Sequence, residues 1–135
     1  MAVKGFRGAK RIDLQIEHRD PDTGRGIPGP IVEAWTYGEH FAIHARPDDV
    51  NAKEWCITHI NTGRGVSHYI DRKRVLTTAA KCMESLPDMG FATQAEFDRL
   101  PYKAKRALID IGRRARFYDV EAMKATVAGM MAELK

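Results

Sequence analysis

Histidines are the side chains best suited to chemistry near neutral pH, and two of them flank a glycine-containing turn. We expect a two-residue type II′ turn at Gly63 and Arg64, a register that places His59 opposite His68 on adjacent strands. His44 would supply a third ligand if its strand lay alongside. The sequence has neither an HxxxH helix nor a carboxylate cluster beside these residues, so we favour sheet histidines without a metal over a metal site.

Candidate nucleophiles are equally scarce. Ser67 lies beside His68, but neighbours in a strand point to opposite faces of a sheet. Cys56 and Cys82 form no CxxC motif and suit small apolar positions in a core. Neither glycine-arginine-glycine segment continues into a GxxxxGK[ST] phosphate loop. We therefore expect no catalytic residue, no bound metal and no cofactor, in a protein that is not an enzyme.

The strongest pattern outside the apolar stripes is basic. The segment from Pro101 to Phe117 carries six cations against Asp110 alone, and a helical wheel places them opposite an apolar stripe. A solvated face would usually mix both signs of charge, so a binding role stands beside the plainer alternative of an exposed helix. Three further cations stand at an expected helix start, where the helix dipole disfavours them. The candidate partner-binding or nucleic-acid-binding residues are Lys103, Lys105, Arg106, Arg113, Arg114, Arg116, Arg72, Lys73 and Arg74.

The composition predicts one soluble globular domain over residues 1–135. Hydrophobic residues make up 44% and charged residues 30%, and the formal net charge of +4 permits nucleic acid or an acidic protein as a partner. No apolar run approaches the roughly 20 residues that cross a bilayer, and the basic N-terminus lacks the apolar segment of a secretory signal. With two cysteines, both expected to be reduced, we expect a cytoplasmic protein without membrane contact.

The first 70 residues have the pattern of strands and turns. Residues 1–30 are expected to be loop-rich with one strand, in which Ile12, Leu14 and Ile16 alternate with polar residues. Residues 20–30 contain prolines and glycines that predict a long turn or flexible loop. Residues 31–70 favour an antiparallel sheet, with Trp55 and Ile57 in a central or near-central strand.

From residue 71 the apolar period changes to 3.6, which predicts a helical part over residues 71–135. Asp71 is the expected N-cap of the first helix, Thr93 of a short second helix and Asp119 of the last helix. The stripes expected to be buried contain Val75, Leu76, Ala79, Ala80, Met83 and Leu86, then Ala104, Leu108, Ile111, Ala115 and Tyr118, then Met123, Val127, Met130 and Leu134. The last stripe would join the core or pair with a second copy in a homodimer. Strands followed by three or four helices predict an α+β fold, with the helices on one face of the sheet.

One segment resembles a pattern found in small phage and prophage proteins. Those proteins carry a strand of the form W-x-[VI]-T-H-x-x-T-G, a returning strand and an amphipathic helix. Here the pattern is matched by Trp55-Cys56-Ile57-Thr58-His59-Ile60-Asn61-Thr62-Gly63, ahead of an alanine-rich helix. The resemblance implies a mobile-element protein that meets host machinery, since many such proteins inhibit host defence, CRISPR complexes included, by covering a surface. It assigns no functional residue.

These observations leave three hypotheses about function. The first is a non-enzymatic, phage-encoded binding protein that inhibits a host protein or nucleoprotein complex in the host cytoplasm. The second is a nucleic-acid-binding accessory protein that uses the 101–117 helix on phosphates, with Tyr102 or Phe117 available to stack on bases. The third, which we favour least, is a small enzyme that uses His59 and His68 as acid and base or as metal ligands.

Overall fold

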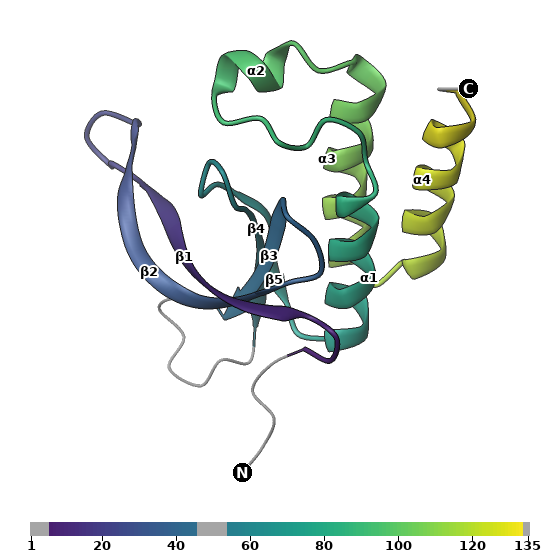
Figure 1. Ribbon diagram of the computed structural model, residues 1–135, viewed down its shortest axis with the longest axis horizontal. Coiled ribbons are helices and arrows are strands. Elements are labelled where there is room, and N and C mark those ends of the chain that lie inside the picture. Colours follow the sequence, from purple (N-terminus) through teal and green to yellow (C-terminus); the bar gives the residue numbers. More distant parts are fainter. Residues whose placement is uncertain (1–5, 46–53, 134–135) are drawn as a thin grey trace.

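The computed structural model describes residues 6–45 and 54–133, which form a five-stranded antiparallel sheet followed by four helices (Figure 1). The strands lie side by side in chain order and are β1 (Lys10–Arg19), β2 (Gly26–Thr36), β3 (Phe41–Ala45), β4 (Trp55–His59) and β5 (Gly65–Ile70). The helices are α1 (Lys73–Glu84), α2 (Gln94–Asp98), α3 (Tyr102–Arg116) and α4 (Val120–Glu133). The predicted α+β fold is therefore confirmed.

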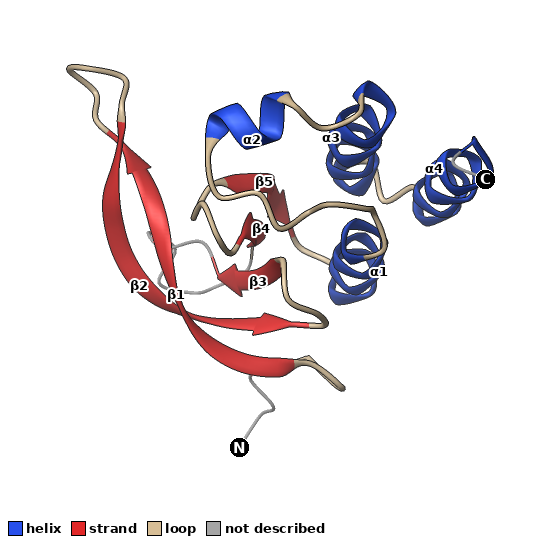
Figure 2. Ribbon diagram, turned by 45° about the horizontal axis from the view of Figure 1, so that its top comes forward, coloured by secondary structure: helices blue, strands red, loops and turns tan. Residues whose placement is uncertain are grey.

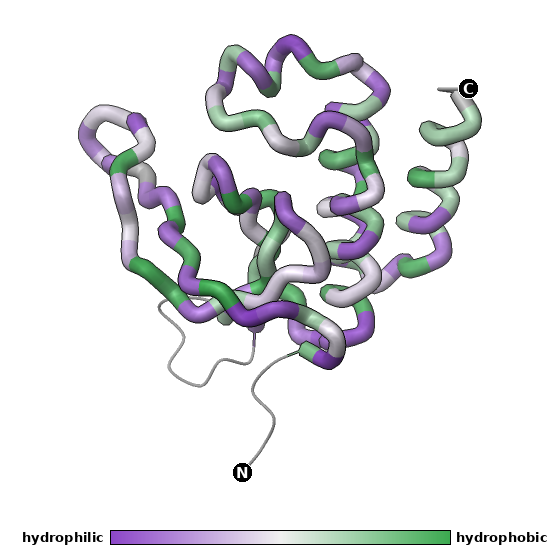
Figure 3. Tube along the Cα trace, viewed as in Figure 1, coloured by the Kyte–Doolittle hydropathy of each residue, from purple (hydrophilic) through white to green (hydrophobic). Residues whose placement is uncertain are grey.

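Strands β1 and β2 form a long curved arm at one edge of the sheet (Figure 1). Hydrophilic and hydrophobic residues alternate along β1 (Figure 3), and Leu14 and Ile16 are buried as predicted. The prediction of a loop over residues 20–30 is wrong beyond Arg25, because β2 begins at Gly26. This glycine- and proline-rich start is held by its partner strand, since Pro28 lies opposite Glu17 in the β1–β2 register.

The sheet is apolar on both faces. On the face covered by α1, Trp35, Ile43 and Ile57 are neighbours across three strands and belong to the main core. The opposite face holds a smaller buried cluster, made of Leu14, Ile16, Ala34 and Ala42. Both Trp55 and Ile57 lie in β4, between β3 and β5, so their predicted near-central position is confirmed.

The helices pack in a layer beside the sheet (Figure 2). Helix α1 contacts β3, β4 and β5 and buries Leu76, Ala80 and Met83, as the sequence predicts. Helix α3 lies against α1 and β5, and α4 packs on α1 and α3. Met123 and Met130 of α4 are buried in the main core, while Leu134 lies outside the described residues. Among the helices described, none has the length and apolar content needed to cross a membrane.

The predictions that Asp71 caps α1 and that Tyr118 is buried are both wrong, because these two residues bind each other. Asp71 is not the N-cap of α1, because that position is Arg72 and no side chain caps the helix there. Instead, the Asp71 carboxylate accepts a hydrogen bond of 2.6 Å from the Tyr118 hydroxyl. Tyr118 follows α3 with a φ of +57° and is 39% exposed rather than buried. The predicted caps of α2 and α4 are confirmed, since Thr93 accepts from the Glu96 N–H and Asp119 from the Ala122 N–H.

The turn between β4 and β5 is longer than the predicted two residues. Thr58 lies opposite Gly65, and the register shifts between Trp55 and Thr58, so the predicted pairing of His59 with His68 is wrong. Gly63 adopts a φ of +71°, and a Cβ there would lie 2.8 Å from the Gln15 carbonyl oxygen. This turn therefore packs against β1, and that contact favours glycine at the position.

Two contacts fix the helices to the sheet. The Glu84 carboxylate, at the end of α1, accepts hydrogen bonds from the backbone N–H groups of Glu39 (3.3 Å), His40 (2.9 Å) and Phe41 (2.7 Å), in the turn before β3 and at its first residue. Where α3 crosses β5, Gly112 permits close approach, since a Cβ there would lie 2.5 Å from the Val66 carbonyl oxygen. The first contact positions α1, and the second positions α3, the helix with the basic face.

Candidate functional site

Among the side chains that the structure describes, His59 belongs to no metal-binding cluster. His59 is 1% exposed and stacks on Phe91 with ring centroids 3.9 Å apart. Its Nε2 lies 2.7 Å from the Met89 carbonyl oxygen and its Nδ1 2.9 Å from the Thr62 hydroxyl, so Nε2–H donates and Nδ1 accepts. Burial lowers the pKa of His59, which favours this neutral form. His59 is thus a core residue that joins β4 to the loop before α2.

The other candidate groups lie apart from His59. His44 faces the opposite side of the sheet, where its Nε2 lies 2.7 Å from the Thr58 hydroxyl, so it does not supply a third ligand beside His59. The side chain of His68 lies outside the described part of the structure. Cys56 is buried, and burial raises the pKa of the half-buried Cys82. Within residues 6–45 and 54–133, no three His, Cys, Asp or Glu side chains gather closely enough to hold a metal ion.

Helix α3 has a buried half of small and apolar residues and an exposed half that carries its cations. Pro101 stands at the N-cap position, where it has no N–H to leave unpaired, and the next 15 residues form the helix. Its inner half packs on β5, α1 and α4; the buried residues are Ala104, Ala107, Leu108, Ile111, Gly112 and Ala115. The outer half carries the predicted cations, of which Lys105 is half-buried; the others, all exposed, are Lys103, Arg106, Arg113, Arg114 and Arg116. The structure therefore brings all six onto one side of one helix.

Exposed apolar side chains stand among these cations. Tyr102 is 69% exposed, Ile109 56% and Phe117 75%. Their spacing of seven and eight residues keeps them in register along the helix, with Arg106 and Arg113 between them. The row is about 22 Å long at 1.5 Å per residue. We call this row, together with Lys103, Lys105, Arg114 and Arg116, the α3 surface.

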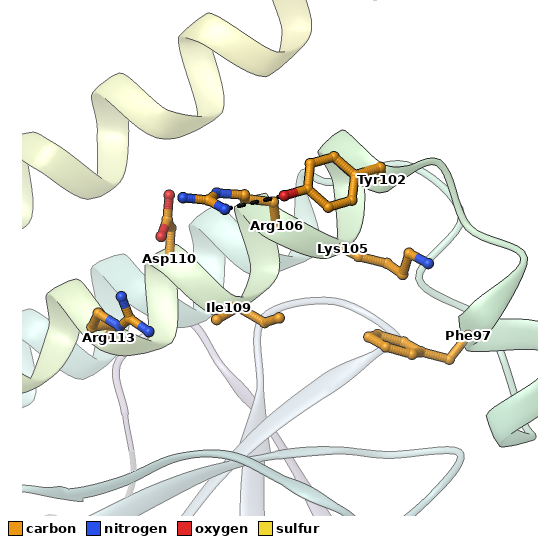
Figure 4. A pocket seen from close by; sticks show the side chains of 7 residues that line it. All are labelled: Phe97, Tyr102, Lys105, Arg106, Ile109, Asp110 and Arg113. Atoms are coloured by element: carbon orange, nitrogen blue, oxygen red, sulfur yellow. Dashed lines mark hydrogen bonds between the residues drawn. The ribbon is translucent and has the colours of Figure 1, made fainter.

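The N-terminal half of the α3 surface borders a cleft of about 290 Å³ (Figure 4). Phe97 of α2 forms one wall, and the remaining lining residues are Tyr102, Lys105, Arg106, Ile109, Asp110 and Arg113. The Arg106 guanidinium donates to the Tyr102 hydroxyl at 3.1 Å, and this contact raises the pKa of Arg106. The Lys105 ammonium donates to the Asp98 carbonyl oxygen at 3.0 Å. The cleft thus places three cations and the Asp110 carboxylate around the apolar side chains of Phe97 and Ile109.

The second basic group is divided by the fold. The Arg72 guanidinium lies over the Tyr118 ring, 4.1 Å from its centroid, and so adjoins the end of α3. Lys73 and Arg74 line a different cleft, which they share with Arg7. Sequence reasoning missed Ile109, although its position on the helical wheel falls outside the buried stripe and among the cations. It also missed Arg7 and Phe97, which reach their clefts only through tertiary packing.

The α3 surface presents positive charge and exposed apolar area side by side. Cations attract and orient a negatively charged surface, and the exposed Tyr102, Ile109 and Phe117 can bury apolar area once it has docked. In the described residues of this surface, Asp110 is the one carboxylate set among the cations. Comparisons of the chain with protein-family models, with curated proteins and with solved structures give no match.

Proposed function

We propose that this chain is a non-enzymatic binding protein whose α3 surface covers an anionic region of a partner. The observation that carries the proposal is the alternation of cations and exposed apolar side chains along α3, from Tyr102 to Phe117. A helix face that only needs to be solvated gains nothing from exposing Ile109 and Phe117, whereas a binding face gains buried area from both. The inner half of α3 already anchors the helix, so the outer side chains are not needed to hold it in place.

The partner that we propose is a host protein or nucleoprotein complex, met in the host-cell cytoplasm and inhibited by steric cover. The phage-like segment from Trp55 to Gly63 motivates the host context, and the α3 surface supplies the contact. Arg72 extends the same positive region past the end of α3 through its contact with Tyr118. A partner with clustered carboxylates or phosphates would relieve the mutual repulsion of these cations.

A nucleic-acid ligand is the second candidate, and the exposure of two aromatic rings favours it. Tyr102 and Phe117 lie at opposite ends of the α3 surface, with arginines between them. Single-stranded nucleic acid is bound by this combination, in which rings stack on bases and cations contact phosphates. The apolar Ile109 between them fits a protein partner better, because an isoleucine offers no flat ring for stacking.

A capture experiment separates the two candidates. The full chain is immobilised and exposed to bacterial lysate, with and without nuclease treatment, beside the variant Arg106→Glu/Arg113→Glu/Arg114→Glu. A matched control, Lys10→Glu/Arg25→Glu/Lys124→Glu, makes the same change in charge at exposed sites outside the α3 surface. We expect a discrete protein partner that survives nuclease and binds the wild type and the control but not the α3 variant. Retention of nucleic acid alone would favour the second candidate, and unchanged capture by the α3 variant would refute both.

A further inference from the structure

A second basic cleft lies on the other side of α1 from α3, where the chain enters β1. Its volume is about 420 Å³, within the range of small-molecule sites. The lining residues come from three separate segments and are Phe6, Arg7, Tyr37, Lys73, Arg74, Thr77 and Thr78. Three are cations, three carry hydroxyl groups, and none is a carboxylate. We propose that this cleft binds the phosphate groups of a phosphorylated ligand.

The wall beneath the cations is firmly packed. Phe6 is buried and contacts both tryptophans of the core, with ring centroids 5.9 Å from Trp35 and 5.2 Å from Trp55. The ammonium group of Lys73 lies 5.1 Å from the centroid of the Phe6 ring. The aromatic cluster therefore holds the segment that carries Arg7 beside the first turns of α1. A site built on packed elements keeps its charges in place before a ligand arrives.

The hydroxyl groups add hydrogen-bonding capacity between the cations. The Tyr37 and Thr77 hydroxyls lie 3.3 Å apart, so one donates to the other and the pair remains able to donate outward. Thr78 lies next along α1 and is half-buried at the same cleft. Phosphate oxygens accept hydrogen bonds from both hydroxyl and guanidinium groups, and the charge-assisted bonds are the stronger of the two kinds.

The charge around the cleft supports an anion rather than a cation or a neutral ligand. Among the described residues that line the cleft, three side chains are cationic and none is acidic. The cleft has room for more than one phosphate, so a polyphosphate or a nucleotide fits it better than a single inorganic ion. A terminal phosphate on a nucleic-acid strand would present the same chemistry.

Calorimetric titration of the full chain tests this proposal with defined probes: pyrophosphate, ATP, adenosine, and one oligonucleotide with either a 5′-phosphate or a 5′-hydroxyl. We expect saturable binding of pyrophosphate and ATP with Kd below about 1 mM, and no binding of adenosine. Preference for the 5′-phosphorylated oligonucleotide over ATP would identify a nucleic-acid end as the source of the phosphate. Absence of saturable binding for every phosphorylated probe would overturn the proposal.

Matched variants locate the binding. Arg7→Gln/Arg74→Gln removes two of the cleft's cations and should lower affinity for the phosphorylated probe about tenfold or more. Arg25→Gln/Arg99→Gln removes the same charge at exposed sites outside this cleft and should leave affinity unchanged. The α3 variant Arg106→Glu/Arg113→Glu/Arg114→Glu should also retain the probe, so this result does not depend on the proposed function. Equal loss in all three variants would show attraction by net charge alone and would refute a site in this cleft.

Discussion

Replacing Gly112 with alanine should destabilise the protein, although alanine is the better helix former. The new Cβ would lie 2.5 Å from the Val66 carbonyl oxygen, closer than the 3.0 Å at which real Cβ atoms stop. That oxygen belongs to the backbone of β5 and cannot rotate away as the end of a side chain can, so α3 must move. Forced repacking of this kind costs about 1–3 kcal/mol. The movement also stretches the bond of 3.2 Å that the Ser67 hydroxyl donates to the Gly112 carbonyl, at about 1 kcal/mol.

Helix propensity offsets only part of that cost. Replacing glycine with alanine in a helix interior raises the free energy of unfolding by about 1 kcal/mol. We therefore expect Gly112→Ala to lower the free energy of unfolding by about 1–3 kcal/mol in total. Gly129→Ala is the matched control, because Gly129 lies in α4 and a Cβ added there would meet nothing within 4 Å. Gly129→Ala should raise the free energy of unfolding by about 0.5–1 kcal/mol. Urea and thermal unfolding followed by circular dichroism measure both changes. Each kcal/mol of stability should shift Tm by roughly 3–5 °C. If Gly112→Ala were as stabilising as Gly129→Ala, the close crossing of α3 and β5 would be refuted.

Three further predictions concern residues that hold the sheet and helices together. Leu76→Ala should cost about 2–5 kcal/mol in urea unfolding, because Leu76 is fully buried; an unchanged midpoint would place the wrong face of α1 on the sheet. Glu84→Ala should lower the free energy of unfolding by about 2–4 kcal/mol in the same assay, because three backbone N–H groups lose a charged acceptor. A decrease no larger than that of Glu121→Ala, at an exposed residue of α4, would contradict this role. Because burial lowers the pKa of His59 in the folded state, stability should be complete above the unfolded pKa of about 6.5 and fall as the pH drops below it. His59→Gln should weaken that fall between about pH 7 and pH 5.5, and an identical pH profile would argue against the buried neutral imidazole.

The helices can be predicted well because their signals are local. A period of 3.6 identifies the buried stripe of α1, and Thr93 and Asp119 cap their helices as their residue types predict. The wrong prediction for Asp71 has a nonlocal cause. Asp71 has a good N-cap side chain, but Tyr118, far away along the chain, takes its carboxylate as a hydrogen-bond acceptor.

The sheet is harder to predict because its pairing is nonlocal. Glycine and proline at the start of β2 have low strand propensity, yet pairing with β1 over a long arm makes them part of a strand. The residue types around Gly63 favour a two-residue hairpin, but packing of the turn against β1 selects a longer turn and a different register. Both the pairing of β2 with β1 and the packing of the Gly63 turn on β1 depend on residues far away in the sequence. Local residue patterns therefore do not predict them.

The candidate site is predictable in charge but not in shape. An excess of cations over acids in residues 101–117 identifies the basic half of α3 from the sequence alone. The sequence cannot show that Arg72 joins that surface while Lys73 and Arg74 turn to another cleft, because the division depends on how α1 and α3 lie side by side. Ile109 lies outside the buried stripe and among the cations, a position that a helical wheel of the segment does show.

The affinity of the α3 variant for the captured partner tests the central claim most directly. Arg106→Glu/Arg113→Glu/Arg114→Glu and the control Lys10→Glu/Arg25→Glu/Lys124→Glu are compared with the wild type at several salt concentrations, after circular dichroism has confirmed equal folding. Our account predicts that the α3 variant loses affinity by about 100-fold or more, with a slower on-rate, while the control stays within about threefold of the wild type. Wild-type affinity in the correctly folded α3 variant would contradict the claim that this surface binds the partner.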